Sequence, residues 1–127
     1  MDGQGLRSKV AALKSLGIEH VIVTDEQDIA TEVARITSGV GCRVIHDPVP
    51  GKGIGKLVDA LATDGMILIY SVLDLAPATI DPLKGTAEFA TINFSVVFRA
   101  LLDAEKRREM AEFVLKGVAN GVEARRR

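Results

Sequence analysis

The sequence predicts an α/β fold in which helices flank a parallel β-sheet. Segments whose apolar residues recur every three or four positions, typical of helices, alternate with short β-branched runs, typical of strands. The clearest unit spans residues 41–71, with a strand at 44–45, a helix over 54–61 and an apolar run at 66–70. A continuous apolar run favours a strand covered on both faces. We therefore expect a right-handed strand–helix–strand unit at the centre of the fold.

Two helices and one strand are expected before this unit. Apolar spacing predicts a short amphipathic helix over residues 6–16, ended by Gly17 in a left-handed cap. A β-branched run at 21–23 predicts the first strand. Asp25 is a good N-cap for a second helix, whose apolar face recurs over residues 29–36.

After the central unit the sequence predicts a linker, a strand and a last helix. The linker covers residues 73–86, which are interrupted by prolines and a glycine. Residues 91–94 are typical of a fourth strand. Asp103 can cap a final helix that ends at Gly117 or Gly121. The alternation of strands and helices indicates a parallel sheet of about four strands.

Composition excludes several classes of function. The 127 residues carry 16 basic and 17 acidic side chains, a net charge of −1, so charge gives no argument for nucleic acid or an anionic membrane. No apolar run approaches the roughly 20 residues that a membrane span needs. The first five residues do not resemble a signal peptide, and a lone cysteine, Cys42, suits a reducing compartment. We expect a cytoplasmic protein. One cysteine and two histidines cannot build an ordinary zinc site, so no metal is expected.

Candidate chemical groups follow the predicted strands. The loop 51–56 (GKGIGK) has neither the Walker A spacing nor its hydroxyl residue, and it is either a plain turn or a backbone contact to a phosphate. His46 and Asp47 end a strand, where ligands bind in such sheets. Adjacent strand residues point to opposite faces, so they are not expected to act as a catalytic pair. Tyr70 either belongs to the core or lines a pocket. No catalytic residue is assigned.

Long stretches of the chain resemble one enzyme superfamily. The passage 8–22 (SKVAALKSLGIEHVI) is similar to a segment of the medium-chain dehydrogenase/reductase superfamily, in particular its quinone oxidoreductase and zinc-free enoyl reductase branch. The similarity continues through residues 34–41, 44–49 (VIHDPV) and 61–70. It covers residues 7 to about 121 in a sustained register rather than in one short motif.

The resemblance implies a Rossmann domain that binds NADPH for hydride transfer to quinones or activated alkenes. It also implies three groups of cofactor-binding residues. The group at the ribose 2′-phosphate comprises Arg7, Ser8 and Lys9. The group near the ribose and pyrophosphate comprises Asp47, Pro48 and Val49. The group near the nicotinamide comprises Tyr70, Ser71 and Val72.

The resemblance also sets the expected domain organisation. Residues 1–6 are expected to be a loose N-terminus, 7–121 a partial Rossmann domain and 122–127 a basic tail. The glycine-rich turn that holds the pyrophosphate would precede residue 7, so we expect its strand to be missing. In the strand order 3-2-1-4-5-6, residues 21–23 match strand 3 and residues 44–45 match strand 4. The expected fold is therefore a partial Rossmann-like, three-layer parallel sheet in which two strands are lacking between these positions.

Three functions remain open at this stage. The chain is either the nucleotide-binding part of an NADPH-dependent quinone or enoyl oxidoreductase, inactive alone, or a non-enzymatic oligomeric assembly module of half-Rossmann type. The third candidate is a small α/β domain similar to flavodoxin or response regulators. Whether the chain is itself an enzyme is left open, and a small-molecule substrate is expected only in a complete enzyme. The resemblance places residues 91–94 at a dimer edge, so a homodimer is the expected assembly.

Overall fold

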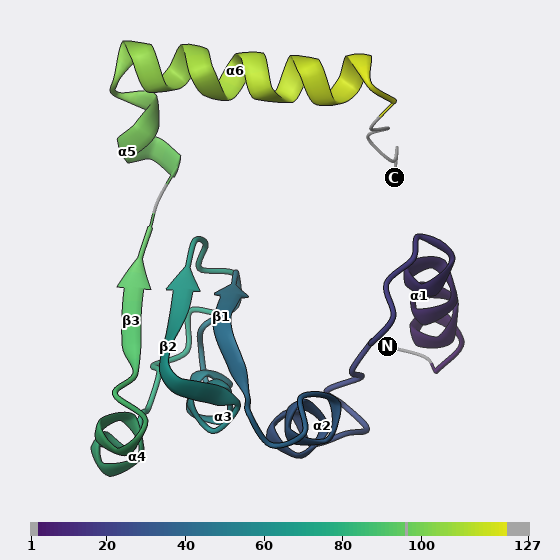
Figure 1. Ribbon diagram of the computed structural model, residues 1–127, viewed down its shortest axis with the longest axis vertical. Helices are drawn as coiled ribbons and strands as arrows, with labels where there is room; N and C mark the ends of the chain where they lie inside the picture. The colour runs from purple at the N-terminus through teal and green to yellow at the C-terminus, as the bar shows by residue number, and fades with distance from the viewer. Residues whose placement is uncertain (1–2, 96, 122–127) are drawn as a thin grey trace. The chain divides into compact units, whose positions relative to one another are not determined.

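The computed structural model describes residues 3–95 and 97–121 and divides into two compact units, residues 1–94 and 95–127 (Figure 1). The basic tail expected at 122–127 lies outside the described residues. The elements of the first unit are α1 (Gly3–Ser15), α2 (Ile29–Ile36), β1 (Cys42–Asp47), α3 (Ile54–Val58), β2 (Leu61–Ile69), α4 (Pro82–Ala87) and β3 (Thr91–Phe94). Those of the second unit are α5 (Val97–Leu101) and α6 (Ala104–Ala119).

The predicted α/β class with a parallel sheet is confirmed. The three strands lie in the order β1-β2-β3 and both pairings are parallel (Figure 1). Ile67, in the C-terminal part of β2, is in register with Ile45 of β1 and with Ile92 of β3. The predicted strand at residues 91–94 is present as β3. The described part of the chain thus holds three strands of a partial Rossmann-like sheet, one fewer than the sequence predicts.

The missing strand is the segment 21–23, which has no regular secondary structure. Its β-branched residues predict a strand, but a strand also needs a neighbour for its backbone groups, and none of the described strands lies beside it. The backbone N–H of Val23 donates instead to Oε1 of Gln27 at 2.9 Å. The predicted cap is also wrong by three residues. Asp28, not Asp25, caps α2, and its carboxylate accepts from the N–H of Thr31 at 3.0 Å.

Strand β2 begins earlier than the sequence predicts. The helix expected over 54–61 stops at Val58, and residues 61–65 extend the strand. Between the pairs Cys42↔Leu61 and Val44↔Met66 the register shifts by three residues, a bulge-like irregularity. Asp64 sits in this bulge with φ of +61°, and its N–H donates to the carbonyl of Glu88 at 2.8 Å. The Asp-Gly pair therefore bends a continuous strand instead of separating a helix from a strand.

Of the remaining helices, α1, α4 and α5 differ from the prediction and α6 agrees with it. Helix α1 begins at Gly3, inside the segment expected to be loose. Helix α4 lies in the predicted linker, where Asp81 caps it and Pro82 occupies its first turn. The final helix, α6, is capped by Asp103 as predicted, through hydrogen bonds of 2.9 and 3.1 Å from the N–H groups of Glu105 and Lys106. Helix α5 has no counterpart in the sequence prediction.

The core covers one face of the sheet. Ile67 and Ile69 of β2 pack with Ile54 and Val58 of α3, and all four are at most 2% exposed. Strand residues alternate between faces, so the neighbours of Ile67 point to the other side. Met66 and Leu68 are only half-buried there, and the adjacent Val44 is 53% exposed. The prediction that β2 is covered on both faces is therefore wrong for this structure.

The second unit is a helix pair whose described residues form no buried core. No residue of α6 is buried, and its large apolar side chains are exposed. One hydrogen bond of 2.9 Å, from Nη1 of Arg107 to the carbonyl of Leu101, joins α6 to the end of α5. None of the described helices is long and apolar enough to cross a membrane.

Candidate functional site

The candidate site lies where β1 and β2 end. Both strands run in the same direction, so the loops after Asp47 and Ile69 leave the sheet at the same edge. Two backbone hydrogen bonds hold these loops side by side. Tyr70 N–H donates to the carbonyl of Asp47 at 3.3 Å, and Leu73 N–H donates to that of Pro48 at 3.0 Å. The structure thus brings together two of the three predicted residue groups, 47–49 and 70–72.

Asp47 is the buried polar residue of this edge. It is 7% exposed and shares the covered face of the sheet with Ile45. Its Oδ1 accepts from the N–H of Val49 at 2.8 Å, which is the turn expected of an Asp-Pro pair. Its Oδ2 is buried and has no hydrogen-bond partner among the described residues. A buried carboxylate oxygen without a hydrogen-bond donor lowers the stability of the fold. A ligand that donates a hydrogen bond to this atom would therefore bind favourably.

A cavity of about 610 Å³ opens beside Asp47. Its size lies within the range of small-molecule sites. The polar residues that line it come from the loop before α2, from the end of β1 and from the loop and first turns of α3. The lining comprises Thr24, Gln27, Ile29, Asp47, Val49, Lys52, Gly53, Lys56 and Leu57.

Two cations of this cavity have no ion-pair partner among the described residues. The ion pairs in that part of the chain join Glu19 to His20, Glu32 to Arg35 and Asp59 to Lys84, and none of them includes Lys52 or Lys56. Lys56 is close enough to Asp28 for its charge to affect the pKa of that carboxylate, which is lowered. The main cause is the hydrogen bond from the N–H of Thr31, followed by that from its hydroxyl, and the charge of Lys56 adds a smaller effect.

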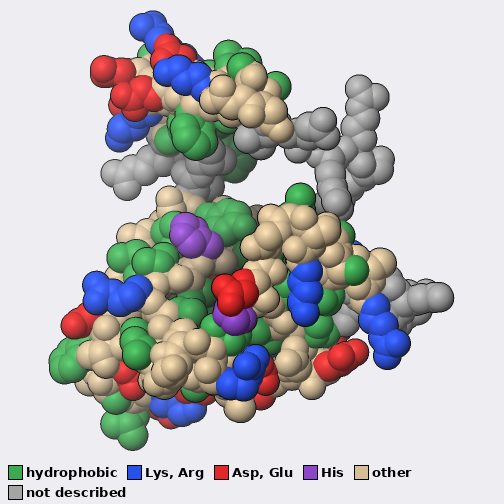
Figure 2. Space-filling view, turned by 45° about the vertical axis from the view of Figure 1, so that its right-hand side comes forward, with side chains coloured by type: hydrophobic (Ala, Val, Ile, Leu, Met, Phe, Trp, Pro, Cys, Tyr) green, Lys and Arg blue, Asp and Glu red, His purple; other side chains and the backbone are tan. Residues whose placement is uncertain are grey.

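Elsewhere, positive and negative side chains are interspersed over the face that Figure 2 shows, with no broad field of one sign.

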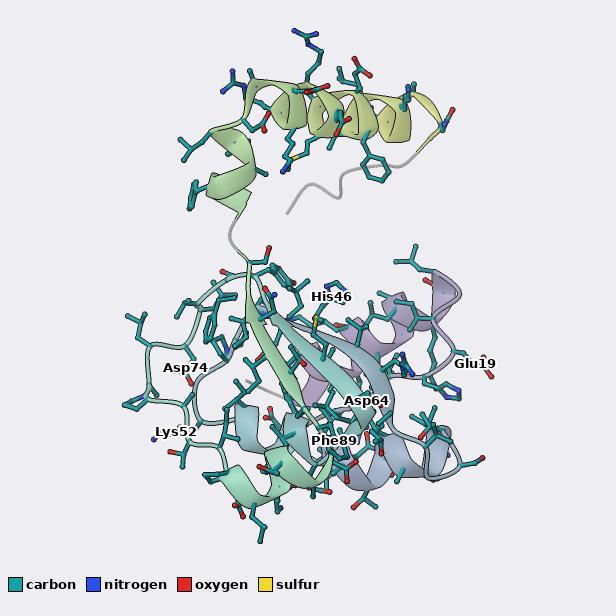
Figure 3. All side chains as sticks on the ribbon, turned by 60° about the vertical axis from the view of Figure 1, so that its left-hand side comes forward. Glu19, His46, Lys52, Asp64, Asp74 and Phe89 are labelled. Atoms are coloured by element: carbon teal, nitrogen blue, oxygen red, sulfur yellow. The ribbon has the colours of Figure 1, made fainter. Side chains whose placement is uncertain are left out.

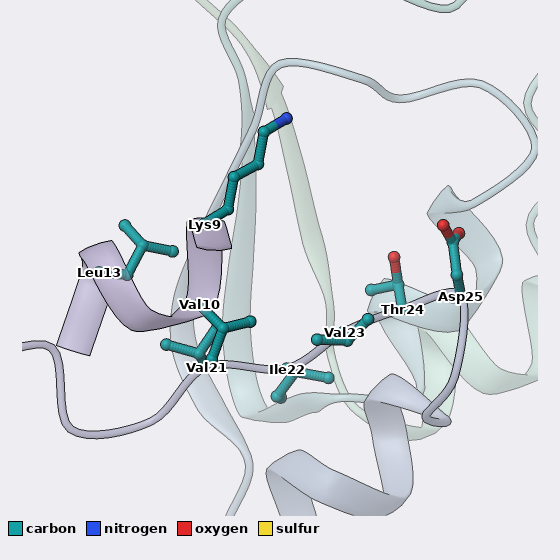
Figure 4. Close-up of a pocket in the computed structure, with 8 residues that line it drawn as sticks. All are labelled: Lys9, Val10, Leu13, Val21, Ile22, Val23, Thr24 and Asp25. Atoms are coloured by element: carbon teal, nitrogen blue, oxygen red, sulfur yellow. The ribbon is translucent and has the colours of Figure 1, made fainter. Parts of the chain in front are cut away.

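The third predicted group is separated from the other two. Lys9 lines a small hollow of about 200 Å³ with Val21 and Asp25, shown in Figure 4. Arg7 lines another hollow, of about 380 Å³, with Glu26. Ser8 lies between them on α1. Neither hollow includes a residue of the β1–β2 edge, although Thr24 lines both the hollow of Lys9 and the larger cavity beside Asp47.

The strand-end residues on the open face form a ring pair. His46 is exposed, and its ring centroid lies 6.4 Å from that of Tyr70 at an interplanar angle of 60°. Tyr70 is 49% exposed and so does not belong to the core. His46 is exposed and Asp47 is buried, which agrees with adjacent strand residues that point to opposite faces.

Val72 lines a second cavity, of about 450 Å³, whose wall is mostly apolar. This cavity also includes Asp74, which the sequence did not single out. Figure 3 shows Asp74 and Lys52 on the loops of one side, away from Asp64 and Phe89. A Cβ added to Gly51 would lie only 1.8 Å from Oδ2 of Asp74. The two site loops therefore approach each other closely at Gly51.

The sequence missed several lining residues for a physical reason. Gln27 and Thr24 enter the cavity through the fold of the loop before α2, which no local pattern specifies. Lys52 and Lys56 could have been found, since their glycine-rich loop was noted as a possible phosphate contact. Among the described residues there is no group of three or more His, Cys, Asp and Glu residues placed to hold a metal ion.

No family model matches the sequence. A curated relative, a phenolphthiocerol/phthiocerol polyketide synthase polypeptide of Mycobacterium tuberculosis, is 26% identical over 120 residues, which are 92% of this chain and 5% of that protein. The same protein of Mycobacterium bovis matches equally. The chain is therefore similar to a small part of a much longer polypeptide.

Solved structures share the fold. A quinone oxidoreductase of Pseudomonas syringae superposes with a TM-score of 0.79 at 21% identity, over 90% of this chain and 35% of that one. An enoyl reductase domain of a polyketide synthase superposes with a TM-score of 0.68 at 24% identity, over 90% of this chain and 62% of that one. A mycobacterial protein complexed with NADPH superposes with a TM-score of 0.65 at 16% identity, over 76% of this chain and 30% of that one. The chain thus spans about a third of the quinone oxidoreductase it matches. These comparisons confirm the predicted resemblance in fold: the chain has the fold of a part of a quinone oxidoreductase and of an enoyl reductase domain.

Proposed function

We propose that the chain is the nucleotide-binding part of an NADPH-dependent oxidoreductase that reduces quinones or enoyl groups. The observation that supports this most is the edge where β1 and β2 end, since two predicted cofactor-binding groups meet there through loop–loop hydrogen bonds. The unpartnered Oδ2 of Asp47 fits a ligand that carries hydroxyl donors, as the ribose of a dinucleotide does. When bound, NADPH supplies the hydride for the reduction.

In this proposal the three groups have different tasks. Arg7, Ser8 and Lys9 meet the 2′-phosphate, because guanidinium and ammonium groups favour a dianion over the bare hydroxyl of NADH. Asp47, Pro48 and Val49 position the ribose and pyrophosphate. Tyr70, Ser71 and Val72 border the nicotinamide. Reduction takes place only in a complete enzyme that also supplies a substrate-binding domain.

The 127-residue chain by itself is expected to bind NADPH weakly. Its glycines at 51, 53 and 55 lack the dinucleotide spacing, so backbone donors for the pyrophosphate are few. The test is a ligand-observed NMR titration with NADPH and NADH at millimolar concentrations. The chain should prefer NADPH, and the double variant Arg7→Ala with Lys9→Ala should lose that preference. Lys116→Ala, an exposed lysine on α6, is the control and should keep it.

Three results would contradict parts of this proposal. Equal losses for both cofactors in the double variant would refute the 2′-phosphate assignment. A low-micromolar dissociation constant for NADPH would refute the expected weakness. No detectable NADPH binding at millimolar concentration would refute nucleotide binding by this chain.

A second proposal concerns the assembly. We propose that two copies of the chain pair through β3, which has a neighbour on one side only in the described sheet. Phe94 in this strand is 73% exposed, and no charged residue falls between residues 89 and 98. An antiparallel copy would satisfy the free backbone groups of this edge by twofold symmetry. This pairing is also what the alternative function, a non-enzymatic assembly module, would require.

A further inference from the structure

We infer that Lys52 and Lys56 bind the phosphate of a phosphorylated sugar whose hydroxyl donates a hydrogen bond to Oδ2 of Asp47. The resemblance assigns no role to either lysine. This inference deepens the proposed function, on which it rests in using the same turn at residues 47–49. It adds two phosphate-binding side chains and names the part of the ligand that they hold.

The first argument is the carboxylate of Asp47. Its two oxygens differ, since Oδ1 is engaged by the N–H of Val49 and Oδ2 has no described partner although the residue is more than nine-tenths buried. An ionised carboxylate only accepts hydrogen bonds, so the missing partner must be a donor. A sugar hydroxyl in the adjoining cavity is such a donor. Its hydrogen bond would satisfy Oδ2 of Asp47, and this gain favours binding.

The second argument is the positive charge among the residues that line the cavity. Lys52 and Lys56 are four residues apart and both line the cavity that Asp47 lines. Neither is neutralised by an ion pair with another described residue. The carboxylate of Asp28, whose pKa is lowered mainly by the hydrogen bonds from Thr31 and less by the charge of Lys56, is already engaged by Thr31. Two unpaired lysines among the lining residues favour an anion, and lysine binds phosphate as a point charge.

The remaining wall fits the body of such a ligand. The side chains of Ile29, Val49 and Leu57 provide an apolar surface, while Thr24 and Gln27 provide polar atoms at the rim. A volume of about 610 Å³ accommodates a sugar phosphate and leaves room for an attached group. A hydroxyl donor and an anionic group in one molecule distinguish this ligand from inorganic phosphate and from an unphosphorylated sugar.

The test is an amide NMR titration of the full chain with ribose 5-phosphate, inorganic phosphate and ribose as separate probes. Ribose 5-phosphate should shift the amides of Val49, Gly53 and Lys56 and bind more tightly than either of the other two. The double variant Lys52→Gln with Lys56→Gln should weaken ribose 5-phosphate about tenfold or more, as expected for losing charge-assisted hydrogen bonds. Lys116→Gln should leave it unchanged.

Asp47→Asn tests the hydrogen bond between the sugar hydroxyl and Oδ2 of Asp47. If this variant does not fold, the comparison of ribose 5-phosphate with inorganic phosphate still reports on the hydroxyl, and equal affinities for the two would overturn the role of Asp47. Unchanged ribose 5-phosphate affinity in the lysine variant, or no binding by the wild-type chain at millimolar concentration, would overturn the inference as a whole.

The outcome is separable from that of the proposed function. Arg7→Ala with Lys9→Ala should not alter ribose 5-phosphate binding, because this probe has no 2′-phosphate. If the lysine variant loses ribose 5-phosphate while the wild type shows no preference for NADPH, the inference stands and the NADPH proposal fails. If the NADPH preference is present and the lysine variant is neutral, the inference fails and the proposal stands.

Discussion

Replacing Gly51 by alanine tests whether the two site loops are held together as the structure has them. The added Cβ would lie 1.8 Å from Oδ2, 2.3 Å from Cγ and 2.8 Å from Cβ of Asp74. The first two atoms could swing aside with the side chain, but the Cβ moves only if the backbone moves. The turn of Asp74 is fixed by its own Oδ1, which accepts from the N–H of Ala76 at 2.8 Å. We therefore expect a loss of about 1–3 kcal/mol in the free energy of unfolding, the usual cost of overpacking.

The same loop offers a matched control. A Cβ at Gly53 would meet no atom within 4 Å, so Gly53→Ala should be close to neutral. Asp74→Ala removes the two nearest atoms and leaves the Cβ at 2.8 Å, so it should restore only part of the loss, giving a coupling of about 1 kcal/mol in a double-mutant cycle.

The measurement is urea unfolding followed by far-ultraviolet circular dichroism, in which the midpoint should move and the slope should not. If Gly51→Ala is as neutral as Gly53→Ala, the close approach of the loops after β1 and β2 is not a feature of the protein in solution.

Three further predictions address assembly, metal and pH. Phe94→Lys, at an exposed position of β3, should convert a homodimer into monomers while the helix content stays native, and light scattering that finds a wild-type monomer at high micromolar concentration would count against pairing through β3. Elemental analysis after dialysis against a weak chelator should find no stoichiometric zinc, because one cysteine and two histidines are too few for the usual ligand sets. The lowered pKa of Asp28 means that its capping contribution is present above its ordinary pKa of 3.8 and is lost as the pH falls through the lower folded value. Asp28→Asn should remove this acid sensitivity of α2, as followed by amide shifts.

The sequence predicts those elements whose stabilising partners are close in the chain. The cap at Asp103 depends on the N–H groups two and three residues later, so local pattern is enough to place it. The segment 21–23 has an equally clear pattern, but a strand requires a neighbour from elsewhere in the sheet, and none of the described strands pairs with it. The bulge at Asp64 likewise depends on Glu88, which lies 24 positions away. Long-range partners decide both cases.

The candidate site shows the same division. That residues 47–49 and 70–72 lie side by side follows from the parallel pairing of two consecutive strands, which the pattern of residues 41–71 predicts. That Asp74 lies against Gly51, and that Gln27 lines the cavity beside Asp47, depends on how irregular loops pack, for which the sequence carries no periodic signal.

The order of the strands separates the two proposed interactions in space. Strands β1 and β3 both pair with β2 and with no other described strand, so they form opposite edges of the sheet. The cavity with Asp47, Lys52 and Lys56 is built from residues 24–57, on the side of β1. The apolar edge that would accept a second copy is β3, on the other side of β2. We therefore expect that a variant that abolishes one of the two proposed interactions leaves the other at its wild-type strength.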